Sequence, residues 1–177
     1  MSGNAALDPP LEGLALEYSA WKGWRYKVYG RFHPVRRKRM AAYARQSLRY
    51  AGKMRYTEGP TRSELFHRKP GNFATAAADC SQYVSALAHW CGVKKVTDED
   101  WTGSLYSKGK VLTKPVPGCV VIFGVAPGVH AAYMVGKGMT IGFGDQAAPS
   151  YVSLSGMLDY FARHGHPGHA FRDLTRG

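Results

Sequence analysis

The chain has 177 residues, and 45% of them are hydrophobic, which is enough for one domain of ordinary size with a buried core. It contains no run of about eighteen apolar residues, so we expect no membrane span. The three cysteines, Cys80, Cys91 and Cys119, are odd in number and far apart. This pattern argues against a disulfide framework and against a zinc site.

The formal net charge is +12, and most of the excess lies in one region. Twelve of the 24 Lys and Arg residues fall between Lys22 and Arg55, a stretch that contains no Asp or Glu. Such a region attracts polyanions by long-range electrostatics and counterion release. Anionic wall polymers, nucleic acid and acidic lipid are therefore the candidate partners.

The first predicted element is a helix over residues 35–51, which Pro34 can open and Gly52 can close. Its apolar face carries Met40, Tyr43 and neighbouring small residues, while basic residues lie off that face. The segment from 56 to 75 contains Gly-Pro and Pro-Gly breakers and is predicted to be a long loop. A second helix is expected to begin near Asp79, a favoured N-cap residue, and to stop at Gly92.

The second half of the chain is predicted to be mostly strands. Residues 119–124, 130–136 and 139–144 are rich in strand-forming residues and are separated by turn sequences, which indicates an antiparallel meander. A short helix over 155–163 and a last strand over 169–174 follow. Helices followed by strands indicate the α+β class, with N-terminal helices packed on an antiparallel sheet.

Cys80 is the candidate nucleophile because it directly follows the predicted N-cap. The reactive form is the thiolate, which the unpaired N–H groups and the dipole of a helix N-terminus stabilise. The alternative is a small buried hydrophobic residue, which is the usual role of a free cysteine. We assign Cys91 and Cys119 to the core, because one continues the apolar stripe of the helix and the other opens a strand.

His130 is the candidate general base, since it begins a strand directly after a Pro-Gly turn and could take the thiol proton. An exposed loop histidine is the alternative. A hairpin turning symmetrically about Lys137-Gly138 would pair positions whose numbers sum to 275, so Asp145 would face His130 and orient it. A turn one residue longer would give this place to Gln146, and a dyad without either stays open. We expect thiol and imidazole to meet on the wall of an open groove.

The order and spacing of these motifs resemble those of the NlpC-type cell-wall cysteine peptidases over roughly residues 36–175. The segments that carry the resemblance are Tyr56–Arg62, Asp79–Ser81, Pro117–Gly124, His130–Gly136 and Gly144–Pro149. The first and last of them are most similar to the peptidase domain of actinobacteriophage endolysins. The resemblance implies a papain-like fold and cleavage of peptidoglycan stem peptides, often at a γ-D-glutamyl–diaminopimelate bond.

The resemblance also implies roles for single residues. Cys80 would be the nucleophile and His130 the base, and Tyr56 would help to bind the substrate or the oxyanion, although a packing aromatic is an equal interpretation of Tyr56. Two positions depart from the family pattern. The polar third residue, often twelve or thirteen positions after the base, falls on Gly142 or Phe143, and Cys119 stands where Asp is common.

We therefore predict an endolysin-type cysteine endopeptidase, with the peptidase domain in residues 35–177 and a basic, aromatic N-terminal extension in residues 1–34. Its expected partners are peptidoglycan and anionic wall polymers, toward which residues 22–55 would hold it, and its mechanism requires no metal or organic cofactor. The start of the chain lacks the basic and apolar pattern of a Sec-type signal peptide. We thus expect it in the host cytoplasm before release to the cell wall.

Two alternatives remain. The basic residues of 22–55, interleaved with Trp, Tyr and Phe, could form a nucleic-acid-binding module that contacts phosphates and stacks on bases. Nucleic acid is the less favoured partner, because it leaves the arrangement of Cys80 and His130 unexplained. The second alternative is a catalytically inactive cell-wall-binding domain that has lost its third residue.

Overall fold

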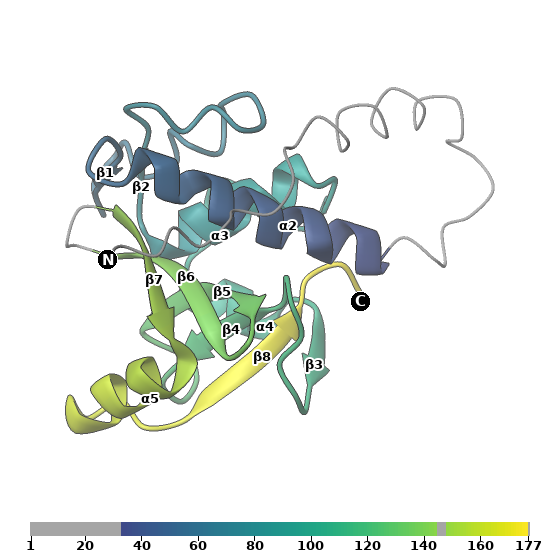
Figure 1. Cartoon of the computed structure of the whole chain (residues 1–177), viewed down its shortest axis with the longest axis vertical. Coiled ribbons are helices and arrows are strands. Elements are labelled where there is room, and N and C mark those ends of the chain that lie inside the picture. Colours follow the sequence, from purple (N-terminus) through teal and green to yellow (C-terminus); the bar gives the residue numbers. More distant parts are fainter. Residues whose placement is uncertain (1–32, 145–147, 177) are drawn as a thin grey trace, which may run out of the picture. The chain divides into compact units, whose positions relative to one another are not determined.

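A computed structural model describes residues 33–144 and 148–176 of the chain (Figure 1). The predicted first helix is confirmed as α2 (His33–Ser47), which continues as a 3-10 turn, η1 (Leu48–Tyr50). The predicted loop after it is bounded by two short strands that pair in parallel, β1 (Arg55–Tyr56) and β2 (Ala77–Ala78). The helix expected after Asp79 is α3 (Cys80–Trp90).

The second half of the chain forms an antiparallel sheet of six strands within the described residues. The strand order is β3-β8-β4-β5-β6-β7, and every pair in it is antiparallel. The strands are β3 (Lys110–Leu112), β4 (Val120–Phe123), β5 (His130–Gly136), β6 (Met139–Gly144), β7 (Ala148–Ser153) and β8 (His169–Asp173). The predicted meander is confirmed as β4, β5 and β6, and the α+β class is confirmed with it.

Five elements were not predicted from the sequence. They are the short helix α4 (Thr102–Ser107) and the strands β1, β2, β3 and β7. Each is short or lies at an edge of the sheet, where the apolar periodicity that reveals an element is weakest. The predicted helix after β7 is present as α5 (Leu154–Arg163).

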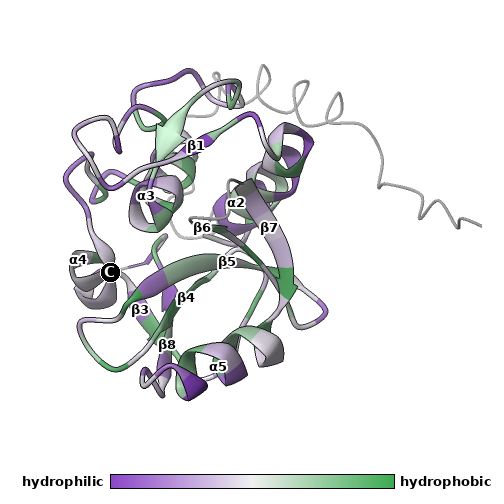
Figure 2. Cartoon of the chain, turned by 90° about the vertical axis from the view of Figure 1, so that its left-hand side faces the viewer, coloured by the Kyte–Doolittle hydropathy of each residue, from purple (hydrophilic) through white to green (hydrophobic). Residues whose placement is uncertain are grey.

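The sheet lies between two layers of helices, α2 and α3 on one face and α5 on the other (Figure 2). Alternate residues of β5 point to the two faces. Ala131, Tyr133 and Val135 join the larger core under α2 and α3, whereas Ala132 and Met134 join a smaller core under α5. This alternation decides which face of the sheet each side chain of the candidate site reaches.

Within the described residues no helix is both long enough and apolar enough to cross a bilayer.

Candidate functional site

The start of α3 is built by the side chain of Asp79. Its Oδ1 accepts a hydrogen bond from the backbone N–H of Gln82 at 2.7 Å and another from the hydroxyl of Ser81 at 2.7 Å. An N-cap side chain of this kind satisfies helical N–H groups that otherwise lack a partner. The predicted N-cap is therefore confirmed, and Cys80 is the first residue of the helix.

The thiol of Cys80 lies at the junction of three elements. The residue is only 6% exposed. Its Sγ is 4.0 Å from the hydroxyl of Thr102, the first residue of α4, and it also accepts a hydrogen bond from the backbone N–H of Ala131 in β5. Thr102 was not singled out from the sequence, because α4 has no strong pattern and its distance from Cys80 along the chain hides the contact.

Burial raises the pKa of the Cys80 thiol to about 11. The hydrogen bonds from Ala131, Thr102 and the N–H of Ser81 act in the opposite direction, and the nearby carboxylate of Asp79 adds to the rise. The N–H of Ser81 at the helix start favours the thiolate, as expected, but the desolvation of the buried thiol outweighs it. The expectation that the sulfur lies on an open groove is not met, because the residue is buried.

The His130 ring lies on the α5 face of β5. Its centroid is 5.9 Å from that of Phe123 and 5.5 Å from that of Phe161, against which it stacks. Ala131 belongs to the other core, under α3. The imidazole thus lies on the α5 face of β5, and the residue that follows His130 carries the N–H that reaches the sulfur.

Residue 142 of β6 lies directly beside the imidazole. A Cβ built on Gly142 would be 2.9 Å from Nε2 of His130 and 3.1 Å from the Cβ of Ala132. This is the position, twelve after His130, where the sequence resemblance leads one to look for a polar third residue. A glycine there leaves the ring its space and offers it no side chain.

The predicted hairpin turn is confirmed, because Lys137 and Gly138 both have the positive φ that a type I′ turn requires, and Gly136 pairs with Met139. Beyond the turn, however, the register shifts by one residue between Met134 and Gly136, so that Ala132 pairs with Gly142. Continued to the strand end, this register aligns position 130 with 144 rather than 145. The pairing predicted from a symmetric turn was wrong because a bulge intervenes.

Asp145, the predicted third catalytic residue, and Gln146, its alternative, both lie outside the described residues. Their roles remain predictions.

Tyr56 lies near the thiol, as predicted from the sequence resemblance. Its strand pairs with the residues just before the nucleophile, with Tyr56 opposite Ala78. Its hydroxyl donates to Glu58 at 2.9 Å, and its ring packs 5.8 Å from that of Phe143. Burial raises the pKa of Tyr56, and the charge that Cys80 would carry as a thiolate raises it further. The phenol therefore remains a hydrogen-bond donor at neutral pH, and both a packing and a binding role fit its position.

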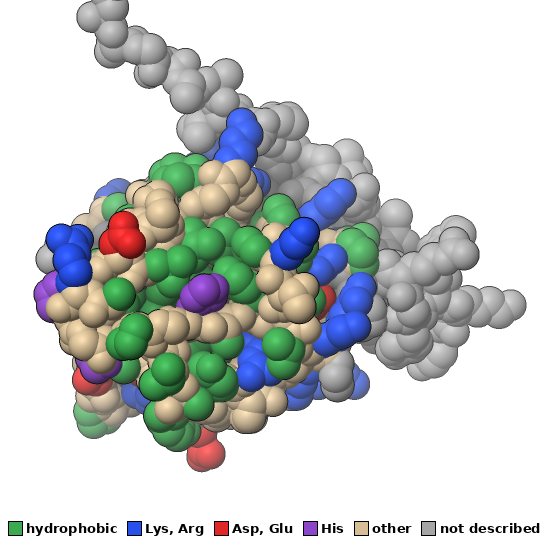
Figure 3. Space-filling model, turned by 90° about the horizontal axis from the view of Figure 1, so that it is seen from below, with side chains coloured by type: hydrophobic (Ala, Val, Ile, Leu, Met, Phe, Trp, Pro, Cys, Tyr) green, Lys and Arg blue, Asp and Glu red, His purple; other side chains and the backbone are tan. Residues whose placement is uncertain are grey.

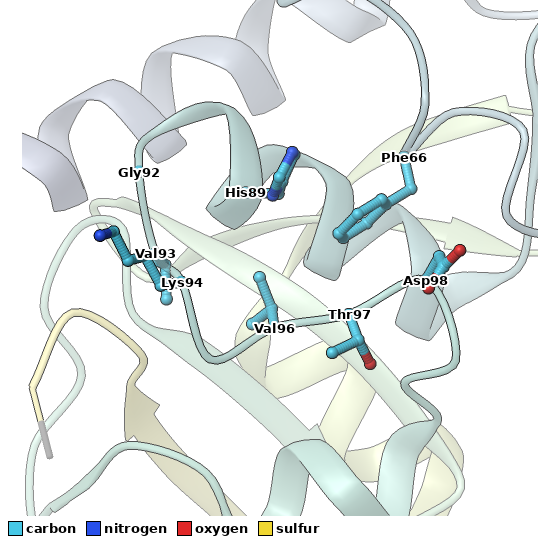
Figure 4. Close-up of a pocket in the computed structure, with 8 residues that line it drawn as sticks. All are labelled: Phe66, His89, Gly92, Val93, Lys94, Val96, Thr97 and Asp98. Atoms are coloured by element: carbon cyan, nitrogen blue, oxygen red, sulfur yellow. The ribbon is translucent and has the colours of Figure 1, made fainter.

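A separate cavity of about 340 Å³ lies at the other end of α3 (Figure 4). Its wall includes the stacked rings of Phe66 and His89, whose centroids are 4.3 Å apart, and the chain from Gly92 to Asp98. Its lining residues on and just after α3, His89 and Gly92, lie at the C-terminal end of the helix that Cys80 begins. Among residues 33–144 and 148–176, no three His, Cys, Asp or Glu side chains lie close enough together to hold a metal ion.

No protein-family model matches the chain, and no curated protein matches it. Several solved structures are similar to it. NlpC1 from Trichomonas vaginalis is 15% identical with a TM-score of 0.52, and the match covers 77% of this chain and 43% of that one. NlpC2 from the same organism is 16% identical with a TM-score of 0.49, covering 77% and 46%. The NlpC/p60 domain of the peptidoglycan hydrolase SagA is 19% identical with a TM-score of 0.47, covering 74% and 96%.

The likeness to NlpC1 shows that this chain has an NlpC-type fold, as the sequence resemblance predicted. Since the TM-scores of NlpC2 and SagA lie below 0.5, the fold assignment rests on NlpC1. The chain spans less than half the length of the two Trichomonas proteins.

Proposed function

We propose that the protein is a cysteine peptidase that hydrolyses amide bonds in the stem peptides of peptidoglycan. The observation that carries the proposal is the position of Cys80, at the capped start of α3 and hydrogen-bonded to the residue that follows His130. The proposal is compatible with the NlpC-type fold that the likeness to NlpC1 shows.

In the proposed reaction, Sγ of Cys80 attacks the carbonyl carbon of the scissile amide while His130 takes the thiol proton. The tetrahedral intermediate then collapses, the C–N bond breaks, and the imidazolium gives its proton to the leaving amine. Water attacks the resulting thioester, with His130 as base, and releases the carboxylate and the free thiol. Backbone N–H groups at the start of α3, and the phenol of Tyr56, are suitable donors to the oxyanion.

The raised pKa of Cys80 makes the base essential to this scheme. With a pKa of about 11, the thiol keeps its proton at neutral pH, so the nucleophile must be generated by proton transfer rather than stored as an ion pair. In this scheme the imidazole of His130, at the start of β5, accepts the thiol proton. A substrate that displaces the residues around the Cys80 thiol would also expose the sulfur.

Two observations favour a second candidate, an inactive domain that binds the cell wall. The thiol is buried, and position 142 beside the imidazole is a glycine. Such a domain would bind peptidoglycan without cleaving it. The same experiment separates the two candidates.

The decisive experiment incubates purified muropeptides with the protein and with Cys80→Ala and detects new amines and carboxylates by mass spectrometry. Cys91→Ala is the matched control, because Cys91 caps the other end of α3 and is 7% exposed against 6% for Cys80. Product from wild type and Cys91→Ala, and none from Cys80→Ala, is expected. Equal product from Cys80→Ala would overturn the thiol mechanism, and wall binding without product from wild type would favour the inactive domain.

Our finer proposal is an endolysin that cleaves the γ-D-glutamyl–diaminopimelate bond and remains in the host cytoplasm until it is released to the wall. It is supported by the sequence resemblance in Tyr56–Arg62 and Gly144–Pro149. The masses of the fragments in the muropeptide assay identify the bond. To test the endolysin role and the cytoplasmic location, the protein is induced in a host with and without permeabilisation of the membrane. Lysis only when the membrane is also permeabilised is the expected result.

We further propose that the basic region holds the protein to anionic wall polymers. The face that looks downward in Figure 1 also carries Lys and Arg side chains along one side, where Asp and Glu are sparse (Figure 3). In the described part of the region, Arg37 pairs with Asp173 at 3.2 Å and Arg45 donates to the carbonyl of Val135, so these two stabilise the fold. The exposed residues Lys38, Arg49 and Lys53 are the better candidates for polymer binding.

The test compares sedimentation with walls that retain or lack their anionic polymers, at rising salt. Triple replacement of Lys38, Arg49 and Lys53 by Gln should weaken binding only to walls that retain the polymers, and salt should do the same. Equal binding of both wall preparations would contradict the proposal. Tight, salt-sensitive binding of DNA without wall binding would favour the nucleic-acid module instead.

A further inference from the structure

Arg62 joins the start of the nucleophile helix to the segment that precedes α4. Its Nη1 donates to Oδ2 of Asp79 at 2.6 Å. Its Nη2 donates to the backbone carbonyls of Glu99 at 3.0 Å and Asp100 at 3.1 Å. One planar guanidinium therefore bridges a carboxylate and two carbonyls from segments far apart in the sequence, which the fork of donors of an arginine can do and a lysine cannot.

Both segments that Arg62 joins lead directly to the surroundings of the Cys80 thiol. Asp79 caps the helix that begins with Cys80, and the segment that ends at Asp100 leads through Trp101 to Thr102, whose hydroxyl is 4.0 Å from the sulfur. A change in the distance between the two segments would change the surroundings of the sulfur directly.

The carboxylate and the backbone of Asp100 show that this junction is a built site. Asp100 is 2% exposed; its side chain accepts from Thr97 N at 2.9 Å and Ser104 Oγ at 2.8 Å and pairs with Lys108. Its carbonyl, besides Arg62, accepts from Gln82 Nε2 in the first turn of α3 at 2.6 Å, and Ser81 Oγ, whose proton goes to Asp79, lies 3.2 Å away.

We propose that Arg62 is a positioning residue of the thiol site, which fixes the first turn of α3 against the Glu99–Thr102 segment and offsets the charge of Asp79 beside Cys80. This inference rests on the proposed function for its link to catalysis, but its geometry does not. Asp79 sits one residue from the nucleophile, and its negative charge opposes ionisation of the thiol. Without Arg62, the largely buried carboxylate of Asp79 would lose its described ion-pair partner.

The titratable and charged groups around the thiol come from each neighbouring element. They are Asp79 with its partner Arg62, Tyr56 on β1, and His130 at the start of β5. Of these groups, a substitution of Arg62 changes only the ion pair that it forms with Asp79. Its effect on the titration of Cys80 can therefore be assigned to the Arg62–Asp79 pair and the geometry it holds.

The test measures alkylation of Cys80 by iodoacetamide as a function of pH, with the modified residue identified by tandem mass spectrometry. The variants are Arg62→Gln, which loses charge and fork, and Arg62→Lys, which keeps the charge alone. Arg55→Gln is the matched control, because Arg55 is an exposed arginine whose described pair, with Glu64 at 3.3 Å, does not touch the site. Muropeptide hydrolysis is measured on the same proteins.

We expect the pH midpoint of alkylation to rise by about one unit in Arg62→Gln and to return most of the way in Arg62→Lys. The kcat of hydrolysis should fall about tenfold or more in both variants, with KM little changed, because the fork that fixes the geometry is lost in both. If Arg62→Gln fails to fold, a fall in kcat with a preserved midpoint in Arg62→Lys supports the same conclusion.

The proposal is overturned if Arg62→Gln, or Arg62→Lys where Gln does not fold, matches Arg55→Gln in both readouts. Its failure is distinguishable from failure of the proposed function. If wild type hydrolyses nothing while the alkylation midpoint still moves in Arg62→Gln, the positioning role stands and the peptidase proposal falls.

Discussion

Replacing Gly142 by alanine should displace the imidazole of His130 without unfolding the protein. The new Cβ would be 2.9 Å from Nε2, whereas ordinary contacts begin at 3.4 Å, so the ring must move by about 0.5 Å, the difference between the two. The ring is held by its stack on Phe161, with 5.5 Å between centroids, and the movement disturbs that stack. A displacement of this size in a base that must reach the thiol should lower kcat/KM about tenfold.

The same substitution should change the free energy of unfolding by less than about 1 kcal/mol. Gly142 does not have a positive φ, so alanine brings no backbone strain, and the loss of unfolded-state entropy partly offsets the crowding. Gly144→Ala is the matched control, since it lies two residues further along β6 and no described atom is within 4 Å of its Cβ. Muropeptide hydrolysis and urea unfolding are measured on both.

Equal activity of Gly142→Ala and Gly144→Ala, with both folded, would refute the reasoning. It would mean either that His130 is not the base or that its ring leaves this position in the working state. A large loss of stability in Gly142→Ala would show that the ring cannot yield, and the activity could then not be interpreted alone.

Two further predictions concern the core. Ser47→Ala should lower the free energy of unfolding in urea by about 1–3 kcal/mol, because it leaves the buried hydroxyl of Tyr83 without its described partner at 2.8 Å. Tyr83→Phe should lower it by about 1 kcal/mol or less, because Ser47 still donates to the Ala44 carbonyl at 2.7 Å. A larger loss in Tyr83→Phe than in Ser47→Ala would contradict this reasoning. Burial raises the pKa of Cys91 from 9.0 to about 12, so as the pH rises the thiol ionises first in the unfolded chain. The contribution of the buried, protonated Cys91 to the free energy of unfolding is therefore complete below pH 9 and is lost progressively above it. Between pH 9 and 11 the free energy of unfolding should therefore fall more steeply with pH in wild type than in Cys91→Ala, by up to about 1.4 kcal/mol per pH unit. Identical slopes for the two proteins would show that the buried thiol does not cause a loss of stability in this range.

Local patterns in the sequence predicted much of the fold. The N-cap at Asp79, the apolar face of α2 and the turn at Lys137-Gly138 each follow from short-range chemistry, which acts within a few residues and leaves a readable pattern. The bulge before Gly136 had no such signal, and it moved the register of the far end of β5 by one residue. A register depends on every residue between the turn and the strand end, so one local irregularity changes all later pairings.

The amino-acid sequence by itself determined which chemical groups are present and where helices and strands begin, because capping, breaking and alternation are properties of neighbouring residues. It placed a thiol at a helix start and an imidazole at a strand start. Only the tertiary structure decided that the thiol is buried, that Thr102 and the N–H of Ala131 reach it, and that Arg62 bridges the segments around it. Desolvation and contacts between distant segments exist only once the chain has packed, and they set the protonation state on which the proposed chemistry depends.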